Sequence, residues 1–231
     1  MTWTQSHSGR AIDLLEPRVS DISAEDIAYH LSRTKRFAGA CDYTNAQHSL
    51  LVASIVWQLT KSMRAACHGL VHDGHETYTG DVIGPMRAAL KQILGQPFKE
   101  AMSQITRNLD AVIFEALELY EPNDDGAITR IVVEADRRAL FIERHLFLAP
   151  PPKPWPGEMT DYETTYRNAI GGLSVDWNRT ILTANEGLLA FRYMLDILRH
   201  KGQDYNIPAD WRGPAGPLRY SLAEAFPGLA L

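Results

Sequence analysis

Apolar residues recur every three or four positions along most of the segment from residue 23 to residue 148, which is the spacing of one face of an α-helix. The clearest runs cover residues 98–120 and 128–148. Ser23 and Asp26 have the spacing of a capping box, which predicts the start of an earlier helix. No segment shows a convincing strand-like alternation of apolar and polar residues. The pattern therefore predicts an all-α protein.

A run of prolines, APPPKPWPG, marks the clearest boundary and is typical of a stiff linker. Beyond it, helices are expected at residues 162–170 and 175–200, followed from residue 201 by a surface-hugging or disordered tail rich in glycine and proline. The resulting prediction has three parts: a domain at 1–148 with its core at 24–148, a proline-rich linker at 149–158, and a helical extension with its tail at 159–231.

Composition narrows the class of protein without identifying it. The 231 residues are 45% hydrophobic and 22% charged, as in ordinary globular proteins, and the formal net charge is −5. Without a block of Lys and Arg, duplex nucleic acid is not an expected partner. Cys41 and Cys67 have no metal-site spacing and form no disulfide framework. Neither a signal-peptide pattern nor a membrane-length apolar run is present, so we expect a cytoplasmic protein with no membrane partner.

The densest chemistry lies in the segment LVHDGHETYTGD, which contains His72, Asp73, His75, Glu76 and Asp81. An imidazole and a carboxylate can hold a divalent cation, and a further carboxylate can handle the proton of a bound water. At helical spacing His72 and Glu76 would share one face. The order H-D-x-H-E differs from the zinc-protease pattern H-E-x-x-H.

Candidate residues also occur outside this segment. His48 lies in the first turn of a predicted helix, where a histidine is a structural residue, a solvent-facing residue or a ligand. Asp136 falls beside the apolar stripe of another helix, where an acid is costly unless it is paired or bound to a metal. Arg36 beside Phe37 could hold a phosphate and stack on a sugar or base. The alternative there is a solvated arginine and a core phenylalanine.

Taken together, these motifs resemble the HD-domain metal-dependent phosphohydrolases, and most closely their bacterial 5′-deoxynucleotidase branch. The resemblance covers residues 24–148 and rests on four ordered stretches: AYHLSRTKRF, NAQHSL, HDGHETYTGD and VEADRRAL. It implies an HD-domain helical bundle with a C-terminal helical extension. It also implies that the metal ligands are His48, His72, Asp73 and Asp136.

The resemblance also implies roles for five further residues. Glu76 would position the attacking water or move its proton, and Asp81 would orient water or deliver a proton to the leaving 5′ oxygen. Arg36 would clamp the phosphate and Phe37, where the branch usually has tryptophan, would pack on the deoxyribose. His75, at a position that is usually small in the branch, would add a phosphate contact or stay outside the reaction.

The implied function is removal of the 5′-phosphate from deoxynucleoside monophosphates. One alternative is a triphosphohydrolase acting on deoxynucleoside triphosphates, which the basic run RTKR leaves open. Another is a non-catalytic module that senses a nucleotide. Two imidazoles and two carboxylates suit one Co, Mn, Zn or Fe ion better than Mg, which prefers oxygen ligands. The expected partners are a nucleotide substrate and, by analogy with relatives, a second copy of the chain.

Overall fold

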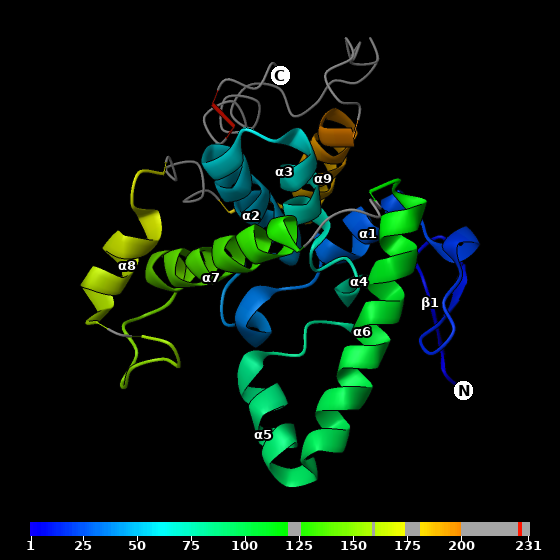
Figure 1. The fold of residues 1–231 in the computed structure, drawn as a ribbon, viewed down its shortest axis with the longest axis horizontal. Coiled ribbons are helices and arrows are strands. Elements are labelled where there is room, and N and C mark those ends of the chain that lie inside the picture. Colours follow the sequence, from blue (N-terminus) through cyan, green and yellow to red (C-terminus); the bar gives the residue numbers. More distant parts are fainter. Residues whose placement is uncertain (120–125, 159, 174–180, 200–225, 228–231) are drawn as a thin grey trace.

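The computed structural model of the chain consists mainly of packed helices (Figure 1), which confirms the all-α prediction. It describes residues 1–119, 126–158, 160–173, 181–199 and 226–227. The elements follow in the order β1 (Trp3–Gln5), β2 (Ala11–Asp13), η1 (Val19–Asp21), α1 (Ala24–Leu31), η2 (Arg36–Gly39), α2 (Asn45–Thr60), α3 (Met63–Val71), α4 (Glu76–Thr79), α5 (Gly84–Leu94), α6 (Gln96–Ala116), α7 (Ala127–Phe147), α8 (Tyr162–Ile170) and α9 (Ala184–Arg199).

Helix α2 is the centre of the fold. Every residue from Asn45 to Trp57 is buried, because α3, α7 and α9 all pack against this helix. Its sequence is accordingly apolar on most sides rather than on one stripe. A methyl group at Gly69 would lie 3.2 Å from the Cα of Ala53, so this glycine lets α3 approach α2 closely. The close approach brings the end of α3 next to the start of α2.

No strand was predicted in the segment before α1, but β1 and β2 pair there as an antiparallel hairpin. Strands of three residues are too short to show an alternating pattern, which explains why the sequence does not reveal them. The hairpin is fastened to α1: the backbone N–H and the hydroxyl of Ser8 both donate to the buried carboxylate of Asp26, at 2.8 and 2.7 Å.

The motif segment is also arranged differently from the prediction. α3 ends at Val71, and the short helix α4 begins only at Glu76. His72 and Glu76 therefore do not share one helix face, and that prediction was wrong. A glycine-containing turn separates them, with Gly74 N–H donating to the carbonyl of Val71 at 2.8 Å.

Helices α5 and α6 form a hairpin that projects from the rest of the molecule (Figure 1). None of the residues of α5, all of which the structure describes, is buried. In α6 the buried residues are Leu109 and Ile113, in the half that reaches the core. None of the described helices combines the length and the apolar character needed to cross a bilayer.

The described helices after α7 pack against the rest of the molecule. Helix α8 has the bounds expected from the sequence, and α9 packs on α1, α2 and α3. Phe226 is buried, and the carbonyl of Pro227 accepts a hydrogen bond from the indole of Trp57 at 3.1 Å. The start of the last predicted helix at 175–180 and most of the predicted tail lie outside the described residues. The division into domain, linker and extension stays a prediction.

Candidate metal centre

Four side chains from three elements converge at the junction of α2, α3 and α7. Nε2 of His48 lies 3.3 Å from Nε2 of His72, 3.5 Å from Oδ2 of Asp73 and 3.1 Å from Oδ1 of Asp136. Nε2 of His72 lies 3.1 Å from Oδ2 of Asp73 and 3.9 Å from Oδ1 of Asp136. The structure thus brings together all four residues that the resemblance implies as ligands.

The spacing and chemistry of these atoms fit a transition-metal site. Ligand atoms bound about 2.0–2.2 Å from such an ion lie roughly 3 Å apart when they are neighbours around it. The distances between the facing atoms of His48, His72 and Asp73 are 3.1–3.5 Å, and these three residues form a group that could hold an ion. Oδ1 of Asp136 lies 3.1 Å from Nε2 of His48 and 3.9 Å from Nε2 of His72. Two imidazole nitrogens and two carboxylate oxygens are donors that Zn, Mn, Co and Fe accept. The cluster is therefore able to hold a metal ion.

The orientation of both histidines supports the same conclusion. Nδ1–H of His72 donates to the carbonyl of Gly69 at 2.8 Å, and Nδ1–H of His48 donates to the carboxylate of Glu143 at 2.6 Å. With Nδ1 protonated in each neutral ring, the Nε2 atoms present lone pairs to one another. Two lone pairs at 3.3 Å do not attract, so a proton or a cation has to stand between them. A hydrogen bond at the other ring nitrogen is what ligating histidines usually have.

Helix α7 holds the imidazole of His48 from both ends. Asp136 contacts its Nε2 and Glu143 contacts its Nδ1. The two acids stand two turns apart on α7, so they project from the same side of the helix. His48 and Glu143 are completely buried. The ring therefore has little freedom to turn away from the cluster.

The electrostatics of the cluster favour bound positive charge. Burial and the charge of Arg36 oppose protonation of His48, but Glu143, Asp136 and Asp73 raise its pKa well above the ordinary value. Burial likewise opposes the charge of Asp73, while His72 and His48 lower its pKa well below the ordinary value. Protons and cations compete for such a site, so metal binding would release protons.

Glu76 opens α4 beside the ligands. A carboxylate oxygen of Glu76, one of Asp73 and a ring nitrogen of His75 all lie within 4.8 Å of one another. The amide of Asn45 donates to Oε2 of Glu76, and Nη2 of Arg87 lies 3.6 Å from Oε1. Burial first, and then the charges of Asp73 and Asp81, raise the pKa of Glu76 to about 8. A cation held by Asp73 would offset that repulsion and favour the ionised carboxylate.

Asp81 and His75 complete the set of residues expected at the site, and a ring nitrogen of His75 lies within 4.8 Å of a carboxylate oxygen of Asp73. Burial raises the pKa of Asp81; Arg36 lowers it and Asp73 raises it, which places Asp81 within the electrostatic reach of the cluster. His75 turns toward α6, where its Nδ1 lies 2.9 Å from Oδ1 of Asp110. This pairing orients the ring of His75 in the way that a carboxylate orients a ligating or hydrogen-bonding histidine.

Arg36 and Phe37 occupy a strained loop next to the cluster. Nε of Arg36 donates to Oε2 of Glu143 at 3.2 Å, and the side chain is only 11% exposed, so it is not the solvated arginine of the alternative interpretation. Phe37 and Ala38 both have left-handed backbone angles, with φ of 55° and 54°. Such angles cost energy for residues other than glycine and are concentrated at functional sites. The ring of Phe37 is half-buried and lies 6.0 Å from that of Trp155.

Several residues that contact the candidate site residues are absent from the sequence-based prediction: Asn45, Arg87, Asp110, Glu143 and Trp155. Of these five residues, only Glu143 could have been identified from a pattern in the sequence. Like Asp136, it is an acid on the apolar stripe of α7, and the two-turn spacing places both on one side of the helix. The other four reach the site through contacts between elements, which no local pattern encodes.

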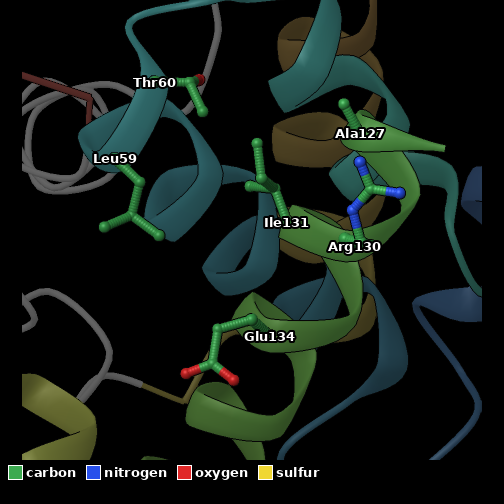
Figure 2. Close-up of a pocket in the computed structure, with 6 residues that line it drawn as sticks. All are labelled: Leu59, Thr60, Ala127, Arg130, Ile131 and Glu134. Atoms are coloured by element: carbon green, nitrogen blue, oxygen red, sulfur yellow. The ribbon is translucent and has the colours of Figure 1, made fainter. Parts of the chain in front are cut away.

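A surface pocket of about 410 Å³ lies away from the cluster (Figure 2). Leu59 and Thr60 from the end of α2, and Ala127, Arg130, Ile131 and Glu134 from the start of α7, form its walls. None of the ligand-type residues described above lines it. The pocket therefore contributes nothing to the metal centre.

No model of a known protein family matches the chain. Two curated proteins are similar to parts of it. It is 37% identical over 94 residues to an uncharacterized protein of Rhodobacter capsulatus, covering 38% of this chain and 48% of that protein. It is 30% identical over 117 residues to the uncharacterized protein YfdR of Escherichia coli, covering 50% of this chain and 58% of that protein. The chain thus spans about half the length of the curated relatives it matches, and neither relative's name states an activity.

Proposed function

We propose that this chain is a metal-dependent phosphohydrolase that removes the 5′-phosphate from deoxynucleoside monophosphates. The observation that carries the proposal is the convergence of His48, His72, Asp73 and Asp136, with distances of 3.1–3.9 Å between their facing atoms. The order of these ligands along the chain, and the motif that follows the second histidine, resemble the HD-domain 5′-deoxynucleotidases.

A divalent ion at this site would supply Lewis acidity toward a phosphate oxygen and lower the pKa of a bound water. Side chains of the protein would transfer the protons and hold the reacting groups in position. Glu76, buried beside Asp73, is placed to accept the proton of the attacking water. Asn45 holds one oxygen of that carboxylate and so fixes its direction. Asp81 is our candidate for the group that gives a proton to the leaving 5′ oxygen.

Arg36 is the proposed phosphate clamp. Within the described residues its side chain bonds Glu143 through Nε, so its terminal amino groups can turn toward a phosphate. Glu143 joins this arginine to His48, so the clamp and one metal ligand share a single buried carboxylate. In the proposed function, Glu143 would thereby couple the position of the phosphate clamp to that of one metal ligand.

The positions of the other basic residues favour a monophosphate over a triphosphate. The guanidinium of Arg33 bonds the Tyr29 carbonyl and Asn185, and Lys35 pairs with Asp42. Of the basic run RTKR, only Arg36 is directed at the cluster. The other arginine near the cluster, Arg87, lies 3.6 Å from the carboxylate of Glu76 and so already faces a negative charge. A triphosphate would bring more negative charge than Arg36 and one divalent ion balance.

The test is to measure phosphate release from deoxy- and ribonucleoside mono- and triphosphates by metal-stripped protein supplied with Co, Mn, Zn or Mg. We expect inorganic phosphate from the deoxynucleoside monophosphates with a transition metal. Pyrophosphate or tripolyphosphate from triphosphates would replace this proposal by the triphosphohydrolase. Nucleotide binding without release of any product would indicate a sensing module.

A further inference from the structure

The proline-rich segment at 149–158 folds back onto α7 near the proposed phosphate clamp. Its last residues form a closed turn, in which Glu158 N–H donates to the carbonyl of Trp155 at 3.1 Å and Gly157 has a φ of 86°. The carboxylate of Glu158 accepts hydrogen bonds from the backbone N–H of Trp155 and from Arg144. Both ends of the turn are thereby fixed.

The anchor of this turn is a fully buried arginine. The guanidinium of Arg144 lies 5.4 Å from the ring of Trp155, 4.6 Å from that of Tyr162 and 5.2 Å from that of Phe141. Its Nε and Nη2 have no hydrogen-bond partner among the described residues. The three aromatic rings therefore supply most of the surroundings of this charge, and they hold Trp155 in place by cation–π attraction.

Glu143 and Arg144 are consecutive residues of α7 with separate partners. Glu143 bonds His48 and Arg36, while Arg144 bonds the turn that carries Trp155. One helix thus fixes Trp155 relative to the metal ligands. Trp155 is half-buried, so the protein does not enclose it completely.

Three groups follow one another outward from the cluster in the order of the parts of a nucleotide. Arg36 bonds the carboxylate that orients His48, and its guanidinium lies 5.6 Å from the ring of Phe37. The ring of Phe37 lies 6.0 Å from the ring of Trp155, with the planes inclined by 64°. A phosphate at Arg36 and a sugar against Phe37 would bring a base to Trp155.

We propose that Trp155 is a substrate-binding residue that stacks on the nucleobase and makes the site selective for nucleotides over simple sugar phosphates. The inference rests on the proposed function for its substrate class. Stacking on an aromatic side chain is tolerant of base identity because every base has a π-face. The rings of Phe37 and Trp155 meet edge to face, and Phe37 stands in a loop with left-handed backbone angles.

The kinetic test compares metal-loaded wild type with Trp155→Ala on the four deoxynucleoside monophosphates and on 2-deoxyribose 5-phosphate, which has no base. We expect KM for the nucleotides to rise about tenfold in Trp155→Ala, with kcat nearly unchanged, and KM for the sugar phosphate to stay the same. Trp155→Phe should restore most of the nucleotide KM. Equal changes for both kinds of substrate, or no change, would overturn the inference.

Binding of the four 2′-deoxynucleosides, followed by tryptophan fluorescence, separates this inference from the proposed activity because it needs no hydrolysis. We expect quenching to be largely lost in Trp155→Phe and kept in Trp3→Phe, a matched change on the other side of the molecule (Figure 1). Quenching that depends on Trp155 without any phosphate release would retain the inference and reject the proposed reaction. Phosphate release with unchanged quenching in Trp155→Phe would reject the inference alone.

Discussion

The metal cluster and the α5–α6 hairpin differ in how their side chains are covered. Around the cluster, each histidine ligand has a partner at its other ring nitrogen, and the acid Glu76 is held by an amide. In α5, by contrast, no residue is buried, although the structure describes the whole helix. Ile93 there is 77% exposed.

The two regions should differ in how easily they rearrange. Buried polar groups that are fully partnered are costly to rearrange, so the cluster should keep one geometry. An exposed helix that packs mainly on one neighbour can open locally at small cost. We therefore expect the cluster to be more rigid than the α5–α6 hairpin, and substitutions in the two regions should have different effects.

The largest effect should come from removing a ligand. We expect His72→Ala to lose bound metal and to reduce activity to that of metal-stripped protein, because one of four donor atoms is missing. The measurement is metal content per chain by elemental analysis. His68→Ala is the matched control in α3, the helix that ends just before His72, since His68 contacts the carbonyl of Leu119 instead. Full metal content in His72→Ala would contradict the ligand assignment.

The next effect should come from the buried partner of His48. We expect Glu143→Gln to weaken metal affinity by about 10–100-fold, because it removes the charge that orients His48 and pairs with Arg36. Competition with a chelator of known affinity measures the change. Glu134→Gln is the control on the same helix, where the carboxylate is exposed and pairs with Arg137. Equal affinities in the two variants would show that the ligands hold their geometry without Glu143.

The next prediction compares the free energy of unfolding of two variants, one at the buried end of the α5–α6 hairpin and one at its exposed end. Leu109→Ala should lower the free energy of unfolding by about 2–5 kcal/mol, because Leu109 is fully buried in the core. Ile93→Ala should change it by no more than about 0.5 kcal/mol. Denaturant unfolding of both variants measures the difference. Similar losses would mean that α5 is covered in solution, for instance by a second copy of the chain.

The smallest effect should come from the β-hairpin, which is held to α1 by hydrogen bonds from Ser8 to the carboxylate of Asp26. Burial works against the charge of Asp26, but hydrogen bonds from Ser8 and Ser6 lower its pKa below the ordinary value of 3.8. A depressed pKa in the folded state adds stability above the unfolded pKa, and this stability is lost as pH falls through the folded pKa. We expect Ser8→Ala to cost about 1–2 kcal/mol at neutral pH and progressively less below pH 3.8.

Unfolding curves of Ser8→Ala and wild type between neutral and acid pH check this expectation. Ser20→Ala, an exposed serine in η1, is the control and should change stability by no more than about 0.5 kcal/mol at any pH. A difference for Ser8→Ala that does not depend on pH would mean that Asp26 is not the group involved.

The sequence was sufficient to predict most of the helices. The periodicity of α6 and α7 and the serine cap of α1 lie within single elements, and the structure has these helices close to the expected bounds. The break between α3 and α4 was missed because a turn at Gly74 interrupts a pattern that otherwise continues at helical spacing. The β-hairpin was missed because its strands are too short for a period to show.

For the candidate site, the reactive residues were easier to predict from the sequence than the residues that hold them in place. His72, Asp73 and Glu76 stand together in the sequence, and Asp136 is conspicuous as an acid beside an apolar stripe. The pairing of His75 with Asp110, and that of Phe37 with Trp155, joins distant parts of the chain. Such pairs depend on how the helices are placed in space, which a single sequence does not specify.

The two-turn spacing of Asp136 and Glu143 on α7 restricts how the length of this chain can vary in evolution. Inserting or deleting one residue between them would rotate one acid by about 100° relative to the other, and His48 would lose a partner at one of its nitrogens. The tip of the α5–α6 hairpin carries no such constraint. Homologous chains should therefore differ in length there while keeping the interval between these two acids.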